Sequence, residues 1–362
     1  MKPEKTGHKK PAMTLTRLNR AKKNLQRAVD DISEEVIGLS DRIHANPETA
    51  FTEVKASTWL ADYLEQQGFL VTRGIAGLKT AFHAILTHGD GPTVAFLSEY
   101  DALPKIGHGC GHNLIAAAGV GAAAGLAKIA GELSGTIVVY GTPAEEGGGG
   151  KITILNEGLF RGVDAVLMIH PSDETVIHRG ALGRFLLTVV FAGRSAHASS
   201  RPTQGLNALD AMISFFVSVG LLRQQLRDDA RVHGIITNGG AAPNIIPDRT
   251  EAVFSVRSLS KDYNEQLIEK VMNCARGAAT ATGTEVKFAI NPLVYEPKKQ
   301  NFVLGELFLA NLATFDVGEI QVHKDPSAGG IGSSDIGNVS QAVPVLNPYI
   351  KIGNHPTHSP GF

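Results

Sequence analysis

Glu99-Tyr100-Asp101-Ala102-Leu103-Pro104, followed closely by Gly107-His108-Gly109-Cys110-Gly111-His112-Asn113, is the most chemically dense part of the chain. It places carboxylate, thiol and imidazole groups between an apolar segment and a segment of small residues. One glycine separates Cys110 from His112, so both side chains can turn toward the same cation, and the flanking glycines let the backbone approach without a Cβ clash. This composition is typical of a metal site.

Three expected strands end at residues of the types that bind metals. The strands predicted at 93–97, 136–140 and 165–169 are followed by the Cys110 loop, by Glu145-Glu146 and by His170. Ligands of open α/β sheets bind outside the carboxyl ends of the strands, so these side chains should converge at one sheet edge. The repeated order of strand, loop and helix, including a packed helix over 114–130, predicts an α/β fold.

Each of these residues also has an ordinary structural interpretation. A lone Cys110 would be a small buried hydrophobe, and a lone His170 would be a core histidine. Paired glutamates at a strand end are usually solvated, but two close carboxylates beside a metal can divide the work. One of the pair then holds the metal while its neighbour acts on the metal-bound water. Near the C-terminus, His355 and His358 are equal candidates on spacing alone.

The residue pattern changes at about residue 182. The order from there is β-α-β-β-α-β, which predicts a ferredoxin-like unit inserted into the first domain. We therefore expect a catalytic domain with a mixed sheet flanked by helices, formed by residues 1–181 and 293–362, and a lid or dimerisation domain over 182–292. Apolar residues at steps of three and four predict a single amphipathic helix from Leu25 to Ile43.

Charge and cysteine content exclude several classes of protein. The 362 residues carry 34 Lys plus Arg and 35 Asp plus Glu, so no net field favours nucleic acid or an anionic membrane as partner. The two cysteines, Cys110 and Cys274, make a disulfide framework implausible, and no apolar core of a signal peptide follows the lysine-rich start. These features predict a cytoplasmic protein with a small-molecule partner. The chain also lacks the Gly-x-Ser-x-Gly pattern of serine hydrolases.

Seven motifs in chain order resemble the carboxypeptidase-G and aminoacylase clan of dinuclear metallohydrolases. Within it the chain is most similar to the amidohydrolase branch of hippurate, auxin-conjugate and aminobenzoyl-glutamate hydrolases, nearest the subgroup of β-alanyl-lysine dipeptidase. The motifs are His44-Ala45-Asn46-Pro47-Glu48, Glu99 to Pro104, His108 to Asn113, Ala144-Glu145-Glu146-Gly147, Ser195-Ala196-His197-Ala198, Asn244-Ile245-Ile246-Pro247 and His358-Ser359-Pro360-Gly361-Phe362.

The resemblance implies a role for each matching residue. Two divalent ions, zinc or manganese with cobalt as a further candidate, would be held by Cys110, His112, Glu146, His170 and His358. Glu145 would be the general base, and Asp101 would orient a metal ligand. From the lid, His197 would polarise the scissile carbonyl, and Asn244 and Arg257 would bind the substrate carboxylate. The resemblance also implies a homodimer formed through the inserted domain.

The sequence therefore predicts a metal-dependent hydrolase that cleaves an amide bond in a small N-acyl amino acid, dipeptide or related amide. Two alternatives remain open. One is a non-catalytic small-molecule binding member, whose metal site is impaired because the chain stops at Phe362, where family members usually continue. The other is a metal-dependent deaminase that releases ammonia.

Overall fold

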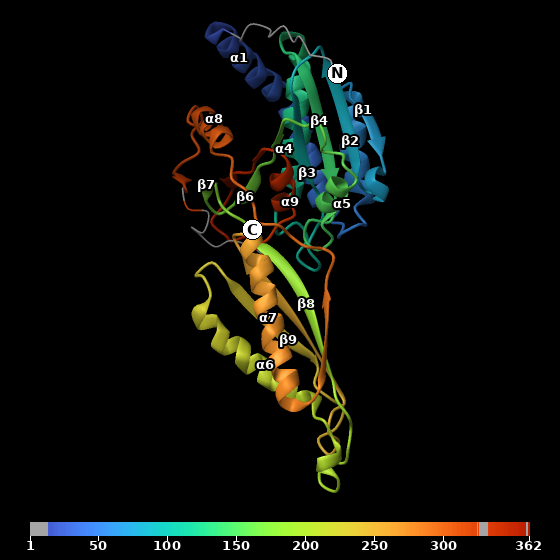
Figure 1. The fold of residues 1–362 in the computed structure, drawn as a ribbon. Helices are drawn as coiled ribbons and strands as arrows, with labels where there is room; N and C mark the ends of the chain where they lie inside the picture. The colour runs from blue at the N-terminus through green and yellow to red at the C-terminus, as the bar shows by residue number, and fades with distance from the viewer. Residues whose placement is uncertain (1–13, 324, 326–331, 360) are drawn as a thin grey trace, which may run out of the picture.

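The computed structural model describes residues 14–323, 325, 332–359 and 361–362. Figure 1 shows a body that contains the N-terminal half of the chain and the C-terminal segments, with a second, elongated unit projecting from it. The chain enters and leaves the projecting unit at neighbouring points, as expected for an insertion. The predicted domain boundaries at 182 and 292 stay a prediction.

A mixed six-stranded sheet forms the centre of the larger body. β3 runs parallel to β4 and β5, whereas β2 is antiparallel to β1 and β4. The order is β1-β2-β4-β3-β5-β13. The strands are β1 (Leu70–Arg73), β2 (Phe82–His88), β3 (Thr93–Glu99), β4 (Gly135–Thr142), β5 (Ala165–Leu167) and β13 (Val345–Leu346). The predicted α/β class with a mixed sheet is confirmed.

Helices cover both faces of this sheet because its central strands alternate apolar side chains between two cores. On β3, Phe96 belongs to one core, and Ala95 and Leu97 belong to the other. The first core includes residues of α2 (Ser33–His44), α3 (Val54–Gln66) and α4 (His112–Lys128); the second includes residues of α5 (Gly150–Asn156) and α9 (Ile336–Ala342). The central strands are therefore buried on both sides, and their carboxyl ends hold the loops that carry the polar motifs.

The single N-terminal helix expected from the sequence is instead two helices, α1 (Leu15–Asp31) and α2. The break lies at Ile32, whose φ of −105° and ψ of 2° are not helical. The hydroxyl of Ser33 donates a hydrogen bond to the carbonyl of Asp30 and so competes with the helical backbone bond at this point. The periodicity of apolar residues in the sequence does not reveal such a local competition for a backbone carbonyl.

The projecting unit has the predicted ferredoxin-like arrangement. Its four antiparallel strands lie in the order β11-β8-β10-β9, and both helices pack on one face of the sheet around Phe215, Phe254 and Leu267. The elements are β8 (Gly183–Ala192), α6 (Ala208–Leu222), β9 (Arg231–Asn238), β10 (Arg249–Ser258), α7 (Lys261–Thr282) and β11 (Glu285–Ile290). The inserted domain of the predicted fold is thus confirmed.

A small third sheet, which the sequence did not predict, lies beside the central one. Its order is β12-β7-β14-β6, formed by β12 (Ile320–Val322), β7 (Thr175–Ile177), β14 (Tyr349–Lys351) and β6 (His170–Ser172). The strand expected to run from 165 to 169 therefore ends at Leu167, and His170 begins a strand of another sheet. His170 pairs there with Tyr349, which ties it to the C-terminal segment.

The remaining helices are short or peripheral. They are α8 (Phe302–Leu312) and the 3₁₀ turns Ile75–Gly77, Ala130–Glu132, Pro202–Gln204 and Arg223–Gln225. In the part of the chain that the structure describes, no helix has the length and apolar character needed to cross a membrane. The cytoplasmic location stays a prediction.

Candidate metal centre

The Cys110 loop reaches its position through a glycine. Gly111 has a φ of +75°, and α4 begins directly after it at His112. A Cβ at residue 111 would lie 2.5 Å from Cγ of Pro171, so no side chain fits there without displacing β6. Gly111 therefore permits both the left-handed turn and the close approach of the loop to the segment that carries His170.

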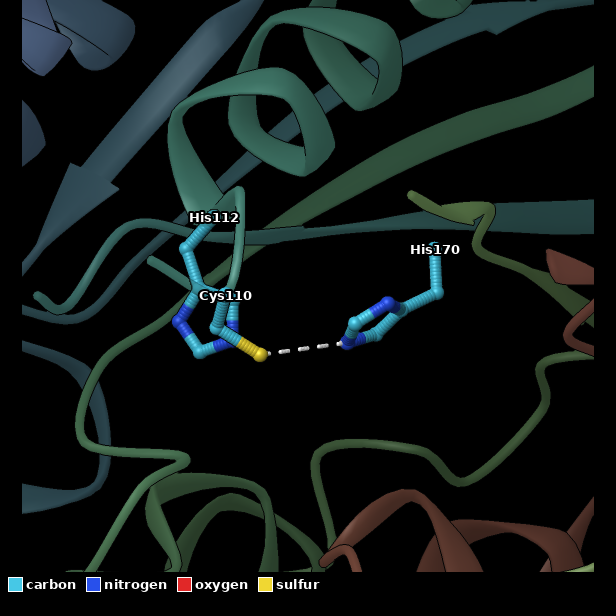
Figure 2. A group of neighbouring side chains, drawn as sticks. All are labelled: Cys110, His112 and His170. Atoms are coloured by element: carbon cyan, nitrogen blue, oxygen red, sulfur yellow. Dashed lines mark hydrogen bonds between the residues drawn. The ribbon is translucent and has the colours of Figure 1, made fainter. Parts of the chain in front are cut away.

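Cys110, His112 and His170 form a first group of possible ligands. Their ligand atoms all lie within 4.8 Å of one another. Figure 2 shows the His170 ring directed at the sulfur of Cys110, and the distance from Sγ to Nε2 is 3.6 Å. Nδ1 of His170 lies 2.7 Å from the carbonyl oxygen of Pro171, which can only accept a hydrogen bond. In the neutral, metal-binding form of the ring, Nδ1 therefore carries the proton, which leaves the lone pair of Nε2 for a cation.

A second group shares Cys110 and adds Glu146 and His358. Nε2 of His358 lies 3.2 Å from Oε1 of Glu146. The backbone N–H of His358 donates to the carbonyl of Gly109 over 2.7 Å, which fastens the C-terminal loop to the Cys110 loop. The exposed His355 belongs to no candidate group among the described residues. All five predicted ligands thus fall within these two groups, which share the thiol of Cys110.

Asp101 lies behind these groups and connects two of their members. Its Oδ1 is 3.0 Å from Nδ1 of His112, and its Oδ2 accepts the backbone N–H of Glu146 over 3.0 Å. This geometry directs Nε2 of His112 toward the candidate centre, consistent with the predicted orienting role. The buried carboxylate cannot itself reach the solvent, because its side chain has no exposed surface.

The residues fit a divalent cation. Nε2 of His112 is buried and has no hydrogen-bond partner in the described part of the chain. Instead it faces carboxylate oxygens of Glu99 at 3.5 Å and of Glu145 and Glu146 at 3.9 Å each. The converging donors are a thiolate, imidazoles and a carboxylate. Zinc binds to such a donor set, and manganese or cobalt can also bind to it.

The electrostatics of the cluster favour an ionised thiol. Burial by itself raises the pKa of Cys110, but the nearby imidazoles of His112, His170 and His358 outweigh burial and hold that pKa at about 6. Likewise the pKa of Glu146 is lowered, because His358 and His112 outweigh the effect of burial. A thiolate and a carboxylate are the forms that bind a metal ion.

Glu145 lies in a different electrostatic environment from its neighbour. Burial, together with the charges of Glu99 and Asp335, raises the pKa of Glu145 well above its usual value. Two adjacent glutamates therefore differ in basicity, and the one with the raised pKa is the better proton acceptor near neutral pH. This difference matches the division of roles expected for Glu145 and Glu146.

Sequence reasoning assigned no role to three buried charges beside Glu145. The ammonium group of Lys151 lies 2.6 Å from Oε1 of Glu99 and 2.7 Å from Oδ1 of Asp335. The three side chains are essentially inaccessible to solvent. Glu99 could have been found from its place at the end of β3, in the same motif as Asp101. Asp335 lies 184 residues from Lys151, so no local pattern relates the two.

The three predicted lid residues lie at two separate places. Arg257 is near the catalytic domain, where its guanidinium donates to Ser333 over 3.5 Å. His197 and Asn244 are exposed and lie together past the other end of β8, joined by a hydrogen bond from the N–H of Ala198 to the Asn244 carbonyl. The ten residues of β8 separate the two places by about 30 Å. Asn244 and Arg257 of one chain therefore cannot bind one carboxylate together.

Comparison with known proteins places this architecture in a family. Residues 177–282 match the model of the peptidase dimerisation domain of M20 peptidases. The chain is 39% identical to the Xaa-Arg dipeptidase of Mus musculus, over 92% of this chain and 80% of the mouse protein. It is 34% identical to a p-aminobenzoyl-glutamate hydrolase polypeptide of Escherichia coli, over 73% of this chain and 60% of that protein.

Solved structures agree on the fold. A dinuclear metal-binding peptidase of the M20 family from Bacillus subtilis superposes with a TM-score of 0.72 at 22% identity, over 92% of this chain and 93% of that one. The chain belongs to the M20 family of metal-dependent peptidases and amidohydrolases. Its resemblance to amidohydrolases, expected from the seven motifs, is thereby confirmed.

A pair of histidine variants tests which C-terminal histidine is the ligand. His358→Ala should weaken metal binding by at least about 100-fold, since it removes a donor rather than an outer partner. His355→Ala, a matched change three residues away, should leave metal binding unchanged. Metal titration of the two purified variants measures both effects. Equal, mild losses would contradict the assignment of His358.

Proposed function

We propose that this chain hydrolyses the amide bond of a small N-acyl amino acid or dipeptide, with two divalent ions per subunit and Glu145 as general base. The observation that carries the proposal is the pair of ligand groups sharing Cys110, with the carboxylate of Glu145 next to both. Cys110, His112, Glu146, His170 and His358 would hold the ions. The 3.2 Å contact between His358 and Glu146 favours a competent centre over the non-catalytic alternative.

The ions, when bound, would polarise the amide carbonyl and lower the pKa of water. Among the protein side chains, Glu145 would carry out the proton transfers. Its carboxylate, with a pKa raised by burial and by Glu99 and Asp335, would accept a proton from the attacking water and return it to the leaving amine nitrogen. Asp101 would keep His112 in the tautomer whose Nε2 faces the centre. The mechanism requires no covalent intermediate with the enzyme.

The lid would complete the site from two subunits. His197 and Asn244 lie about 30 Å from the end of β8 that adjoins the catalytic domain, so they would serve the site of a partner chain. The matched dimerisation domain supports a homodimer formed through the inserted unit. In the partner's site, His197 would stabilise the oxyanion, and Asn244 would contact the substrate carboxylate from the opposite side to Arg257.

Arg257 supports an amino acid as the amine component of the substrate. Its guanidinium is half-buried and contacts the hydroxyls of Ser255 and Ser333, with no ion pair to a carboxylate in the described part of the chain. Burial and the nearby Arg184 lower the pKa of Arg257, so an added carboxylate would be favoured at this position. The names Xaa-Arg dipeptidase and p-aminobenzoyl-glutamate hydrolase, carried by two relatives, likewise denote substrates with an amino-acid part.

A substrate panel with metal analysis tests the proposal. We expect turnover of dipeptides or N-acyl amino acids, lost on chelation and restored by added divalent metal. Substrates in which the terminal carboxylate is amidated should react more slowly. Release of ammonia in place of an amino acid would favour the deaminase alternative. A fully metal-loaded protein that cleaves no member of the panel would contradict the proposal.

A further inference from the structure

The residue before the two glutamates has a strained backbone. Ala144 has a φ of +61°, although it is not a glycine, and it is completely buried. In this left-handed region the Cβ of an L-residue crowds the backbone, so the conformation persists only where the surroundings enforce it. The chain must therefore contain groups that hold Ala144 in place.

Glu53 is such a group, although it lies 91 residues earlier in the sequence. Its Oε1 accepts the backbone N–H of Ala144 over 2.9 Å, and its Oε2 accepts the hydroxyl of Thr80 over 2.9 Å. The Glu53 residue is completely buried. On the other side, the carbonyl of Ala144 accepts the N–H groups of Gly148 and Gly149 over 2.9 and 2.8 Å. Both peptide groups of Ala144 are thus fixed.

The left-handed turn determines where the next side chain goes. β4 ends at Thr142, and the turn at Ala144 redirects the chain immediately before Glu145. Two buried carboxylates hold the flanking amides, with Glu53 on the N–H of Ala144 and Asp101 on the N–H of Glu146. The hydroxyl of Tyr295 adds a 3.3 Å hydrogen bond to the Glu145 carbonyl. The Glu53 contact is the one on the N-terminal side of Glu145.

We propose that Glu53 is a positioning residue for Glu145, because it holds Ala144 in the left-handed conformation that aims the Glu145 carboxylate at the reacting water. The inference rests on the proposed function of Glu145 as general base. Glu53 touches neither the ligand cluster nor the substrate; it acts through one backbone amide. Asp101, by contrast, supports Glu146 and His112, so loss of Glu53 should disturb catalysis more than metal binding.

Four variants separate this role from ordinary core packing. Glu53→Leu removes the acceptor, and Glu53→Asp keeps the charge but withdraws the oxygen by one methylene group. Glu53→Gln keeps an oxygen that can accept the Ala144 N–H, with Thr80 able to accept from the new amide. Thr80→Val is the matched control, because it removes the other contact of Glu53 and leaves the Ala144 contact intact.

The first readout is backbone hydrogen exchange over residues 143–149 in metal-free protein. We expect exchange there to speed up by roughly tenfold or more in Glu53→Leu and Glu53→Asp, and to stay at the wild-type rate in Glu53→Gln and Thr80→Val. The second readout is steady-state kinetics of the metal-loaded enzyme. The kcat of the Leu and Asp variants should fall about 10- to 100-fold with KM and metal content unchanged, the loss expected for a catalytic group displaced by about 1 Å.

Rescue by glycine provides the decisive comparison. Glycine adopts positive φ readily, so Ala144→Gly should leave the wild type fully active and should restore much of the kcat lost in Glu53→Leu or Glu53→Asp. Wild-type kcat and exchange in Glu53→Asp would overturn the proposal, as would equal losses with and without Ala144→Gly. If Glu53→Leu does not fold, the Asp variant gives the same comparison. Should Glu145→Gln itself keep full activity, the assignment of the base fails, whereas the exchange data still report on the Glu53 contact.

Discussion

Glu145→Gln should lower kcat by about 10²- to 10⁴-fold while both proposed metal ions stay bound, because the change removes only the proposed proton acceptor. The amide is nearly isosteric with the carboxylate, and Glu145 is the neighbour whose pKa is raised by burial, Glu99 and Asp335. Its partner Glu146 instead has a lowered pKa and a 3.2 Å contact with His358. The measurement is kcat together with the metal content of the same sample.

Glu146→Gln is the matched control for this experiment. It makes the same chemical change one residue along the chain, but it removes a proposed ligand, so metal content and activity should fall together. If the metal leaves Glu145→Gln and remains in Glu146→Gln, the roles of the two glutamates are reversed. The pair therefore separates proton transfer from metal binding within one motif.

Activity should reappear when two inactive parents, Glu145→Ala and His197→Ala, exchange subunits. A mixed dimer contains one site in which the catalytic core is intact and the His197 donated by the partner is also intact. Random exchange makes half of the dimers mixed, so the mixture should recover about a quarter of wild-type activity. The reason is the length of β8, which places His197 about 30 Å from the end of that strand next to the larger body and the candidate metal centre.

The control mixture combines Glu145→Ala with the double variant Glu145→Ala/His197→Ala, in which no intact core exists and no activity should return. Subunit exchange must be measured independently, for example by native mass spectrometry of differently labelled chains. Verified exchange without recovery would show that His197 acts in its own subunit or has no catalytic part. The site would then have to be assembled without a partner.

The sequence predicted those parts of the site that follow from local order. Cys110 and His112 are two residues apart, and Glu146 and His170 follow strands or expected strands of one sheet, so their convergence follows from the general geometry of α/β folds. The ferredoxin-like insertion was predictable because its six segments show clearly distinct strand and helix patterns of apolar residues, with matching lengths. To predict these features, one does not have to know which distant segments pack together.

Other features depend on long-range packing and had no local signal. Glu53 precedes α3 like any solvated loop carboxylate, yet it is buried and accepts the backbone N–H of Ala144, 91 residues away. Lys151, near the start of α5, has no sequence neighbour that predicts its buried ion pair with Asp335. The separation of Asn244 from Arg257 also becomes visible only when β10 is paired in register with β8.

The ammonium group of Lys151 has a consequence for how the centre is loaded. It contacts Glu99 and Asp335 and lies within the electrostatic reach of Glu145, so the chain itself supplies a counter-charge to these buried acids. Many small metal-dependent domains are unfolded when empty, because metal binding supplies their free energy of folding. Because this chain supplies such a counter-charge itself, we expect the metal-free protein to fold before its ions bind. Which metal occupies the centre would then depend on the supply around the folded protein as much as on the donor set.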